Sequence, residues 1–225
     1  GEGAGGWSLM DSPTGTGKYW SVALGDVNGD GKLDIAAGSG EGDGLKVWTG
    51  DGAGIWVSAS TGLPVTGNYT DVTLGDVDRD GTPDLVAASH GEGVRAWRRG
   101  GASWTENSTG LPASGDYIAL GDLDNDGDLD VVVSGDGVGV QAWRRGGEVA
   151  WSWSDFSSGL PHGIRYQGMD VGLSDVNNDG KLDIAAASYD AGVGVWTGDG
   201  GGTWTRASDG LPVTGAFYGL TLGDF

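Results

Sequence analysis

The 225-residue chain carries 32 acidic and 12 basic side chains, giving a formal net charge of −20; this argues against nucleic acid or anionic membranes as partners. It contains no cysteine, which excludes a disulfide framework and thiolate chemistry. No apolar run reaches the length of a membrane span, so we expect no membrane insertion.

An internal repeat organises the chain, and its 48 glycines recur with that repeat. A nine-residue acidic segment occurs four times, and the first aspartates of successive copies lie 50, 46 and 53 residues apart. Each period contains four predicted strands: one before the acidic segment, one after it, a third that carries a tryptophan and a fourth that opens on another. Repeats of about 50 residues with four strands each are typical of propeller blades.

The predicted strands follow the same order in every repeat. First strands are expected at Tyr19–Leu24, Tyr69–Leu74, Tyr117–Leu120 and Tyr166–Leu173. Second strands, apolar on both faces, are expected at Leu33–Ala37, Leu85–Ala88, Leu129–Val133 and Leu182–Ala187. Third strands are expected at Leu45–Thr49, Val94–Arg98, Val138–Arg144 and Val193–Thr197, and fourth strands open at Trp56, Trp104, Trp151 and Trp204 before a Gly-Leu-Pro turn.

We therefore expect an all-β fold: a single β-propeller repeat array over residues 1–225, with four-stranded antiparallel blades. The blades are predicted at 17–64, 67–112, 115–161 and 164–212, and are called blades 1 to 4 below. Residues 1–16 are predicted to end a preceding blade, and 213–225, with a strand at Phe217–Leu222, to begin a following one. The chain is then either a window from a longer array or a subunit whose end blades neighbouring chains complete.

The acidic segments, called loops 1 to 4, span residues 26–34, 76–84, 122–130 and 175–183. Each has oxygen-bearing side chains at positions 1, 3, 5 and 9 and glycine at position 6. Calcium takes about six to eight oxygen ligands, and the backbone carbonyl of position 7 adds another oxygen. Hydrated turns use similar residues, but they do not require this full pattern four times. We predict about four calcium ions, with ligands from Asp26, Asn28, Asp30, Lys32, Asp34, Asp76, Asp78, Asp80, Thr82, Asp84, Asp122, Asp124, Asp126, Asp128, Asp130, Asp175, Asn177, Asp179, Lys181 and Asp183.

The loops and the strands that follow them resemble the FG-GAP or VCBS repeats of integrin-α-like β-propellers. The resemblance rests on the D-x-[DN]-x-D-G-x-x-D pattern and the Leu-Asp-Ile-Ala-Ala type of strand after it. It implies that each calcium loop joins the first two strands of a blade, with positions 1, 3, 5 and 9 as ligands. Family propellers typically have seven blades. Ala-Leu-Gly-Asp or Thr-Leu-Gly-Asp replaces the family's Phe-Gly start here.

Other motifs each allow two interpretations. Asn68 and Asn107 begin N-glycosylation acceptor patterns, which also arise by chance. The paired tryptophans of strands three and four either pack between blades or form a sugar-stacking surface. The pairs at residues 98–99 and 144–145 are arginines that either bind an acidic group or offset the nearby acid.

We hypothesise an extracellular, calcium-stabilised propeller that serves as a structural or adhesive surface module, alone or as a subunit of a fibre or larger surface assembly. Its expected partners are further copies of itself or other surface proteins. The alternative is a carbohydrate-binding lectin, with glycans as ligands. A third hypothesis, the propeller of an enzyme such as a polysaccharide lyase, ranks lower because calcium would hold the paired acids ionised and coordinated. We therefore expect no enzyme activity.

Overall fold

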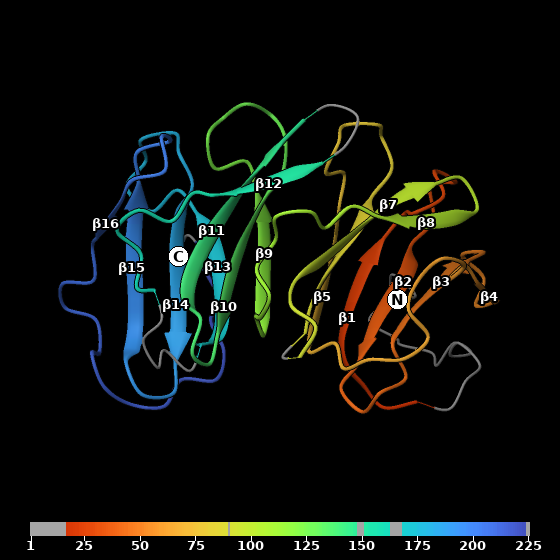
Figure 1. Ribbon diagram of the computed structural model, residues 1–225, viewed down its shortest axis with the longest axis horizontal. Coiled ribbons are helices and arrows are strands. Elements are labelled where there is room, and N and C mark those ends of the chain that lie inside the picture. The colour runs from red at the N-terminus through yellow and green to blue at the C-terminus, as the bar shows by residue number, and fades with distance from the viewer. Residues whose placement is uncertain (1–16, 90, 148–150, 163–167, 224–225) are drawn as a thin grey trace, which may run out of the picture.

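The structure, a computed structural model, describes residues 17–89, 91–147, 151–162 and 168–223. Within these residues it contains sixteen strands and no helix, in four antiparallel four-stranded sheets (Figure 1). The expected all-β propeller with four-stranded antiparallel blades is thereby confirmed. The predicted segment 1–16 lies outside the described residues.

Each sheet contains its four strands in chain order. Blade 1 consists of β1 (Tyr19–Gly25), β2 (Asp34–Ser39), β3 (Leu45–Gly50) and β4 (Trp56–Ser58), and blade 2 of β5 (Asp71–Gly75), β6 (Asp84–Ala88), β7 (Arg95–Gly100) and β8 (Ser103–Glu106). Blade 3 consists of β9 (Tyr117–Gly121), β10 (Asp130–Gly135), β11 (Gly139–Gly146) and β12 (Ser152–Asp155), and blade 4 of β13 (Gly168–Ser174), β14 (Asp183–Ser188), β15 (Gly192–Gly198) and β16 (Trp204–Arg206).

The second strands form the driest part of each blade. Every residue of β6, β10 and β14 is buried. For β6 and β10 the cause is a neighbouring blade on each side, which covers both faces. Three hydrophobic clusters fill the three seams between successive blades. The core is therefore a row of inter-blade layers, and each blade depends on its neighbours for burial.

The Gly-Leu-Pro connections fasten each blade to the next. At the first seam the backbone N–H of Trp104 donates to Thr61 O (2.9 Å), and its indole Nε1 donates to Ala59 O (2.8 Å). Gly62, with φ of +96°, lies so close that a Cβ there would sit 2.2 Å from Trp104 O. The other two seams repeat this arrangement, with Trp153 and Trp204 in place of Trp104.

Blade 3 corrects one sequence prediction. Trp151 was expected to open the fourth strand, but β12 begins at Ser152, and Trp153 makes the inter-blade bonds. Trp151 is instead buried edge-on against Trp153, with ring centroids 6.3 Å apart. The spacing to the Gly-Leu-Pro leucine identifies the correct residue, because Trp104, Trp153 and Trp204 each precede that leucine by seven positions.

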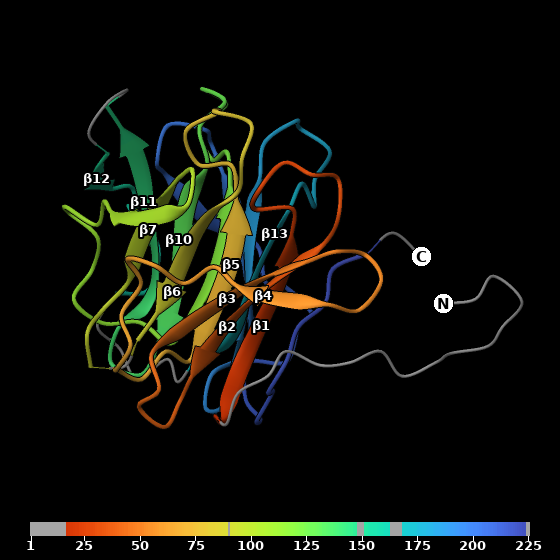
Figure 2. The same ribbon diagram turned by 90° about the vertical axis from the view of Figure 1, so that its right-hand side faces the viewer.

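The first strands of successive blades lie side by side, as β1 and β5 do in Figure 2. Val72 N donates to Ser21 Oγ (3.1 Å), and Ile118 N donates to Asp71 Oδ2 (3.0 Å). Residues 217–222 contain no strand, yet Leu220 N donates in the same way to Asp170 Oδ2 (2.8 Å). Because every acidic loop follows a first strand, this alignment places the four loops along one edge of the array.

Candidate metal centres

The four loops share one hydrogen-bonded framework. The position-1 aspartate accepts the N–H groups of positions 5 and 6; in loop 1, Asp26 accepts from Asp30 at 3.1 Å and from Gly31 at 2.6 Å. The same bonds recur in the other loops at 2.8–3.1 Å. These backbone donors, the Gly31 N–H foremost, lower the pKa of the Asp26 carboxyl, and the Gly180 N–H does the same for Asp175. Position 1 is therefore held as an oriented carboxylate.

The position-9 aspartate anchors each loop to its blade. Asp34, Asp84, Asp130 and Asp183 are fully buried. One carboxylate oxygen accepts the N–H of position 2, and the other accepts an N–H from the third strand, as with Val77 and Arg99 on Asp84 (3.0 and 2.8 Å). Burial raises the pKa of Asp84 and of Asp130 to about 7, so a bound cation would be needed to keep these carboxyls fully ionised at neutral pH.

The loop backbone turns at two positions of positive φ. Position 6 is glycine in all four loops, with φ of +80 to +91°. Position 4 also has positive φ: +73° at Gly29, +60° at Arg79, +58° at Asn125 and +60° at Asn178. The positive φ of position 4 was not predicted from the sequence, although glycine and asparagine there are the residue types that favour this conformation.

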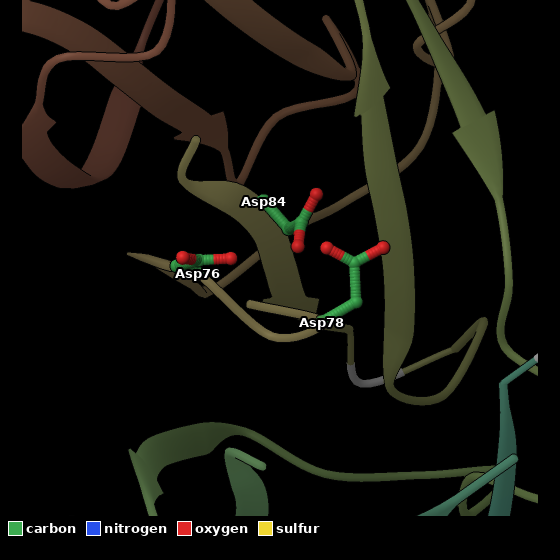
Figure 3. Close-up of side chains that lie close together, drawn as sticks. All are labelled: Asp76, Asp78 and Asp84. Carbon is green, nitrogen blue, oxygen red and sulfur yellow. The ribbon is translucent and has the colours of Figure 1, made fainter. Parts of the chain in front are cut away.

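Carboxylate oxygens converge in loops 2 and 3. Ligand atoms of Asp76, Asp78 and Asp84 lie within 4.8 Å of one another, and so do those of the equivalent residues of loop 3. Figure 3 shows the three loop 2 carboxylates turned toward a common space. Loops 1 and 4 carry asparagine at position 3, so an amide oxygen takes the place of one carboxylate there.

This donor set suits calcium. All side-chain donors are hard oxygens from short side chains, and most oxygens already bound to backbone N–H groups retain a second acceptor site. At position 7 the side chains do not contribute: Asp128 pairs with Arg79 at 2.6 Å and with Arg145, and Lys32 Nζ lies 3.8 Å from Asp30. In loop 2 the Thr82 hydroxyl donates to Asp80. That position 7 contributes its backbone carbonyl as a ligand stays a prediction.

Three arginines contact loop residues in pairings that were not predicted from the sequence. Arg98 pairs with Asp78 (2.5 Å) and Asp80 (3.4 Å), and Arg144 pairs with Asp124 (3.3 Å). Arg79 of loop 2 also reaches loop 3, where its Nη2 donates to Asp126 O at 2.7 Å. The Arg-Arg pairs in the third strands were the available signal, and the interpretation that they offset nearby acid describes Arg98 and Arg144.

The remaining candidate residues lie away from the loops. Asn68 is exposed in the connection between blades 1 and 2, whereas Asn107 is half-buried and its carbonyl accepts the Trp153 indole N–H. Seven tryptophans of the third strands and outer hairpins are mostly or fully buried, which favours packing over sugar stacking: Trp48, Trp97, Trp104, Trp151, Trp153, Trp196 and Trp204. The described residues contain no helix long and apolar enough to cross a bilayer.

Three comparisons relate the chain to known proteins. A family model described as FG-GAP-like repeat matches residues 26–87, 78–133 and 175–225. The comparison with curated proteins gives no match. Among solved structures, the computationally designed Ika4 protein is similar, with a TM-score of 0.56, 14% identity, and coverage of 85% of this chain and 98% of Ika4. Sqt1 of Saccharomyces cerevisiae is similar with a TM-score of 0.59 and 15% identity, and the alignment covers 88% of this chain and 48% of Sqt1. At these identities the structural neighbours show the fold alone.

Proposed function

The chain belongs to the FG-GAP-like repeat family, and on that premise we propose that it is an extracellular, calcium-stabilised β-propeller module with a structural or adhesive role at a surface. FG-GAP repeats occur in extracellular or surface proteins and often bind calcium. The observation that carries the proposal is the shared loop framework, which presents oriented oxygens at the same edge of all four blades.

Calcium would act as the staple of each blade. The loops contain 15 of the 32 acidic residues, and the same-sign charges within one loop repel each other when no cation is present. About four ions would bring the net charge from −20 to about −12. Extracellular modules bind calcium with dissociation constants of about 10⁻⁴–10⁻³ M, which matches the supply outside cells.

A structural role is favoured over catalysis. Propellers of this family are typically non-enzymatic. Within the described residues, the groups of three carboxylates within 4.8 Å of one another are those of loops 2 and 3, where they accept backbone hydrogen bonds and would coordinate the ion.

Blade 1 offers a surface for assembly. Trp20, Val22 and Leu24 on β1 are 63%, 66% and 62% exposed, whereas Val72 on β5, the counterpart of Val22, is buried against blade 1. An apolar sheet face of this kind marks an interaction site. We infer that it packs against another blade, from a further copy or from another surface protein, as in a fibre.

Thermal melting in calcium and in chelator tests the proposal. Asp30→Ala removes the position-5 carboxylate of loop 1, so it should reduce the stabilisation by calcium while the other loops keep theirs. Equal melting midpoints with calcium and chelator in the unaltered chain would refute the calcium role.

Sedimentation of the full chain against a Val22→Thr/Leu24→Thr variant tests assembly, and the variant should lose any association.

A lectin is the second candidate, favoured by one observation. A cavity of about 350 Å³ lies at the seam of blades 1 and 2, lined by Pro64, Tyr69, Glu92, Arg95 and Glu106 among others. Its mixture of aromatic and charged groups is typical of polar-ligand sites. A glycan array should show binding that Glu106→Gln weakens, and no binding to any glycan would exclude this candidate.

Glycosylation of the exposed Asn68 in a secreting host is a separate proposal. The intact mass of the secreted protein would show the attached glycan.

A further inference from the structure

The four loops are of two kinds, distinguished at position 3. Loops 1 and 4 carry asparagine there, and its Nδ2 donates to the position-5 carboxylate: Asn28 to Asp30 at 3.3 Å, and Asn177 to Asp179 at 3.1 Å. Loops 2 and 3 carry aspartate, which has no proton to donate when ionised. Those loops therefore carry one more negative charge and one side-chain donor fewer.

The third strands differ in step with the loops. In each blade a tryptophan of the third strand pairs with the second strand. The residue that follows this tryptophan occupies the same position in all four blades. That position is threonine beside loops 1 and 4 and arginine beside loops 2 and 3: Thr49, Thr197, Arg98 and Arg144. The threonine hydroxyls bond to carbonyls of their own hairpins, at 3.4 Å to Val57 O and Thr205 O.

Arg98 spans the two positions that the asparagine amide joins. Its Nε lies 2.5 Å from Asp78 Oδ2 and its Nη2 3.4 Å from Asp80 Oδ2. Asp78 Oδ1 remains on the loop side, where it accepts the Asp80 N–H at 3.3 Å. The Asp78 side chain is only 3% exposed and that of Arg98 is 41% exposed, so water screens the pair from the guanidinium side alone. In blade 3, Arg144 Nη1 lies 3.3 Å from Asp124 Oδ2, and that side chain is 11% exposed.

We propose that Arg98 and Arg144 are positioning residues for the metal ligands of loops 2 and 3. Each supplies the positive charge that holds the position-3 aspartate in place, with one oxygen on the guanidinium and the other left for a cation. Each also donates one hydrogen bond into its loop, from Arg98 to Asp80 and from Arg144 to Asp124. Loops 1 and 4 reach the same arrangement through asparagine alone. The role of the ion rests on the proposed calcium function, but the pairing itself holds the loop before any ion binds.

A double-mutant cycle on the full chain in chelator tests the pairing without calcium. Arg98→Thr leaves the carboxylates of Asp78 and Asp80 unopposed and should lower the melting midpoint by about 2–4 °C. Asp78→Asn/Arg98→Thr recreates the Asn28–Thr49 combination of blade 1 and should restore most of that loss. Arg95→Thr is the matched control, because Arg95 pairs with Glu106 away from the loops, and its effect should add to that of Asp78→Asn without coupling.

The calcium arm separates this inference from the proposed function. Calcium replaces the missing positive charge, so the calcium-induced rise in melting midpoint should be larger in Arg98→Thr than in the unaltered chain. Additive effects in chelator would overturn the positioning role even if calcium stabilises every variant. Coupling in chelator with no calcium effect would preserve the pairing and reject the calcium proposal. Arg144→Thr with Asp124→Asn repeats the test in blade 3 and should show the same coupling.

Discussion

At the scale of single residues, the buried position-9 aspartates connect the loops to the core. Asp84 and Asp130 each accept two backbone N–H groups, yet burial raises the pKa of both to about 7. Two hydrogen bonds therefore do not offset the cost of removing the charge from water. A divalent cation would offset the rest of that cost. The ionisation of Asp84 and Asp130 should therefore depend on whether calcium is bound.

The pH dependence of the chelated protein follows from this shift. An acid whose folded-state pKa is raised contributes stability that is complete below its unfolded value of about 4 and is lost as the pH rises through about 7. In chelator, the free energy of unfolding from urea titrations should therefore fall between pH 5 and pH 8. Asp84→Asn/Asp130→Asn should flatten that fall, whereas Asp209→Asn at an exposed site should leave it intact. Saturating calcium should also flatten it, because the ion holds both carboxylates ionised.

Two equivalent buried arginines should respond in opposite directions to the same substitution. Arg99 is 7% exposed, lies over the Trp104 ring and has no hydrogen-bond partner for Nε and Nη1 among the described residues. Burial lowers its pKa. Arg99→Met keeps the packing and removes a desolvated charge, so it should stabilise the protein by about 1 kcal/mol.

Arg145 pairs with Asp128 and donates to Gly147 O at 3.1 Å. Arg145→Met should therefore destabilise the protein by about 1–2 kcal/mol, because Asp128 loses one of its two arginine partners and keeps Arg79. Urea denaturation of both variants measures the contrast. Destabilisation of similar size in both would show that Arg99 has a partner after all.

At the scale of elements, the Gly-Leu-Pro connection determines how closely successive blades approach. Gly110 has φ of +99°, and a Cβ there would lie 2.2 Å from Trp153 O. Gly110→Ala should cost more than about 3 kcal/mol, from the strained backbone and from the displaced strand. Gly101→Ala is the matched control, with φ of +62° and no atom within 4 Å of the added Cβ, so only the strain of about 1 kcal/mol should remain. Equal losses of unfolding free energy in the two variants would mean that the approach of Gly110 to Trp153 O leaves room for a Cβ.

The sequence predicted elements well where a local pattern determines them. The acidic loops, the apolar second strands and the Gly-Leu-Pro turns follow from side-chain chemistry and turn geometry that a short window contains. Trp153 was missed because two tryptophans occur in one hairpin, and only the fixed distance to Leu160 separates them. The pairing of Arg98 with Asp78 was missed because the two residues come from different strands, and their contact depends on the register of the sheet.

At the scale of the whole molecule, the contacts between neighbouring blades stabilise the array. Each hydrophobic cluster takes residues from two blades, so loosening one loop weakens two seams at most. Arg79 adds a polar link across one seam, since it donates to Asp128 and Asp126 of the next loop. We expect the calcium loops to act as local braces along one edge of a modular array.

Calorimetric titration of the chelated chain with calcium, together with metal analysis of the dialysed complex, tests the central claim most directly. The account predicts about four ions per chain, with dissociation constants of about 10⁻⁴–10⁻³ M and a higher melting midpoint when the loops are filled. An absence of binding heat, together with a metal content near zero, would contradict it.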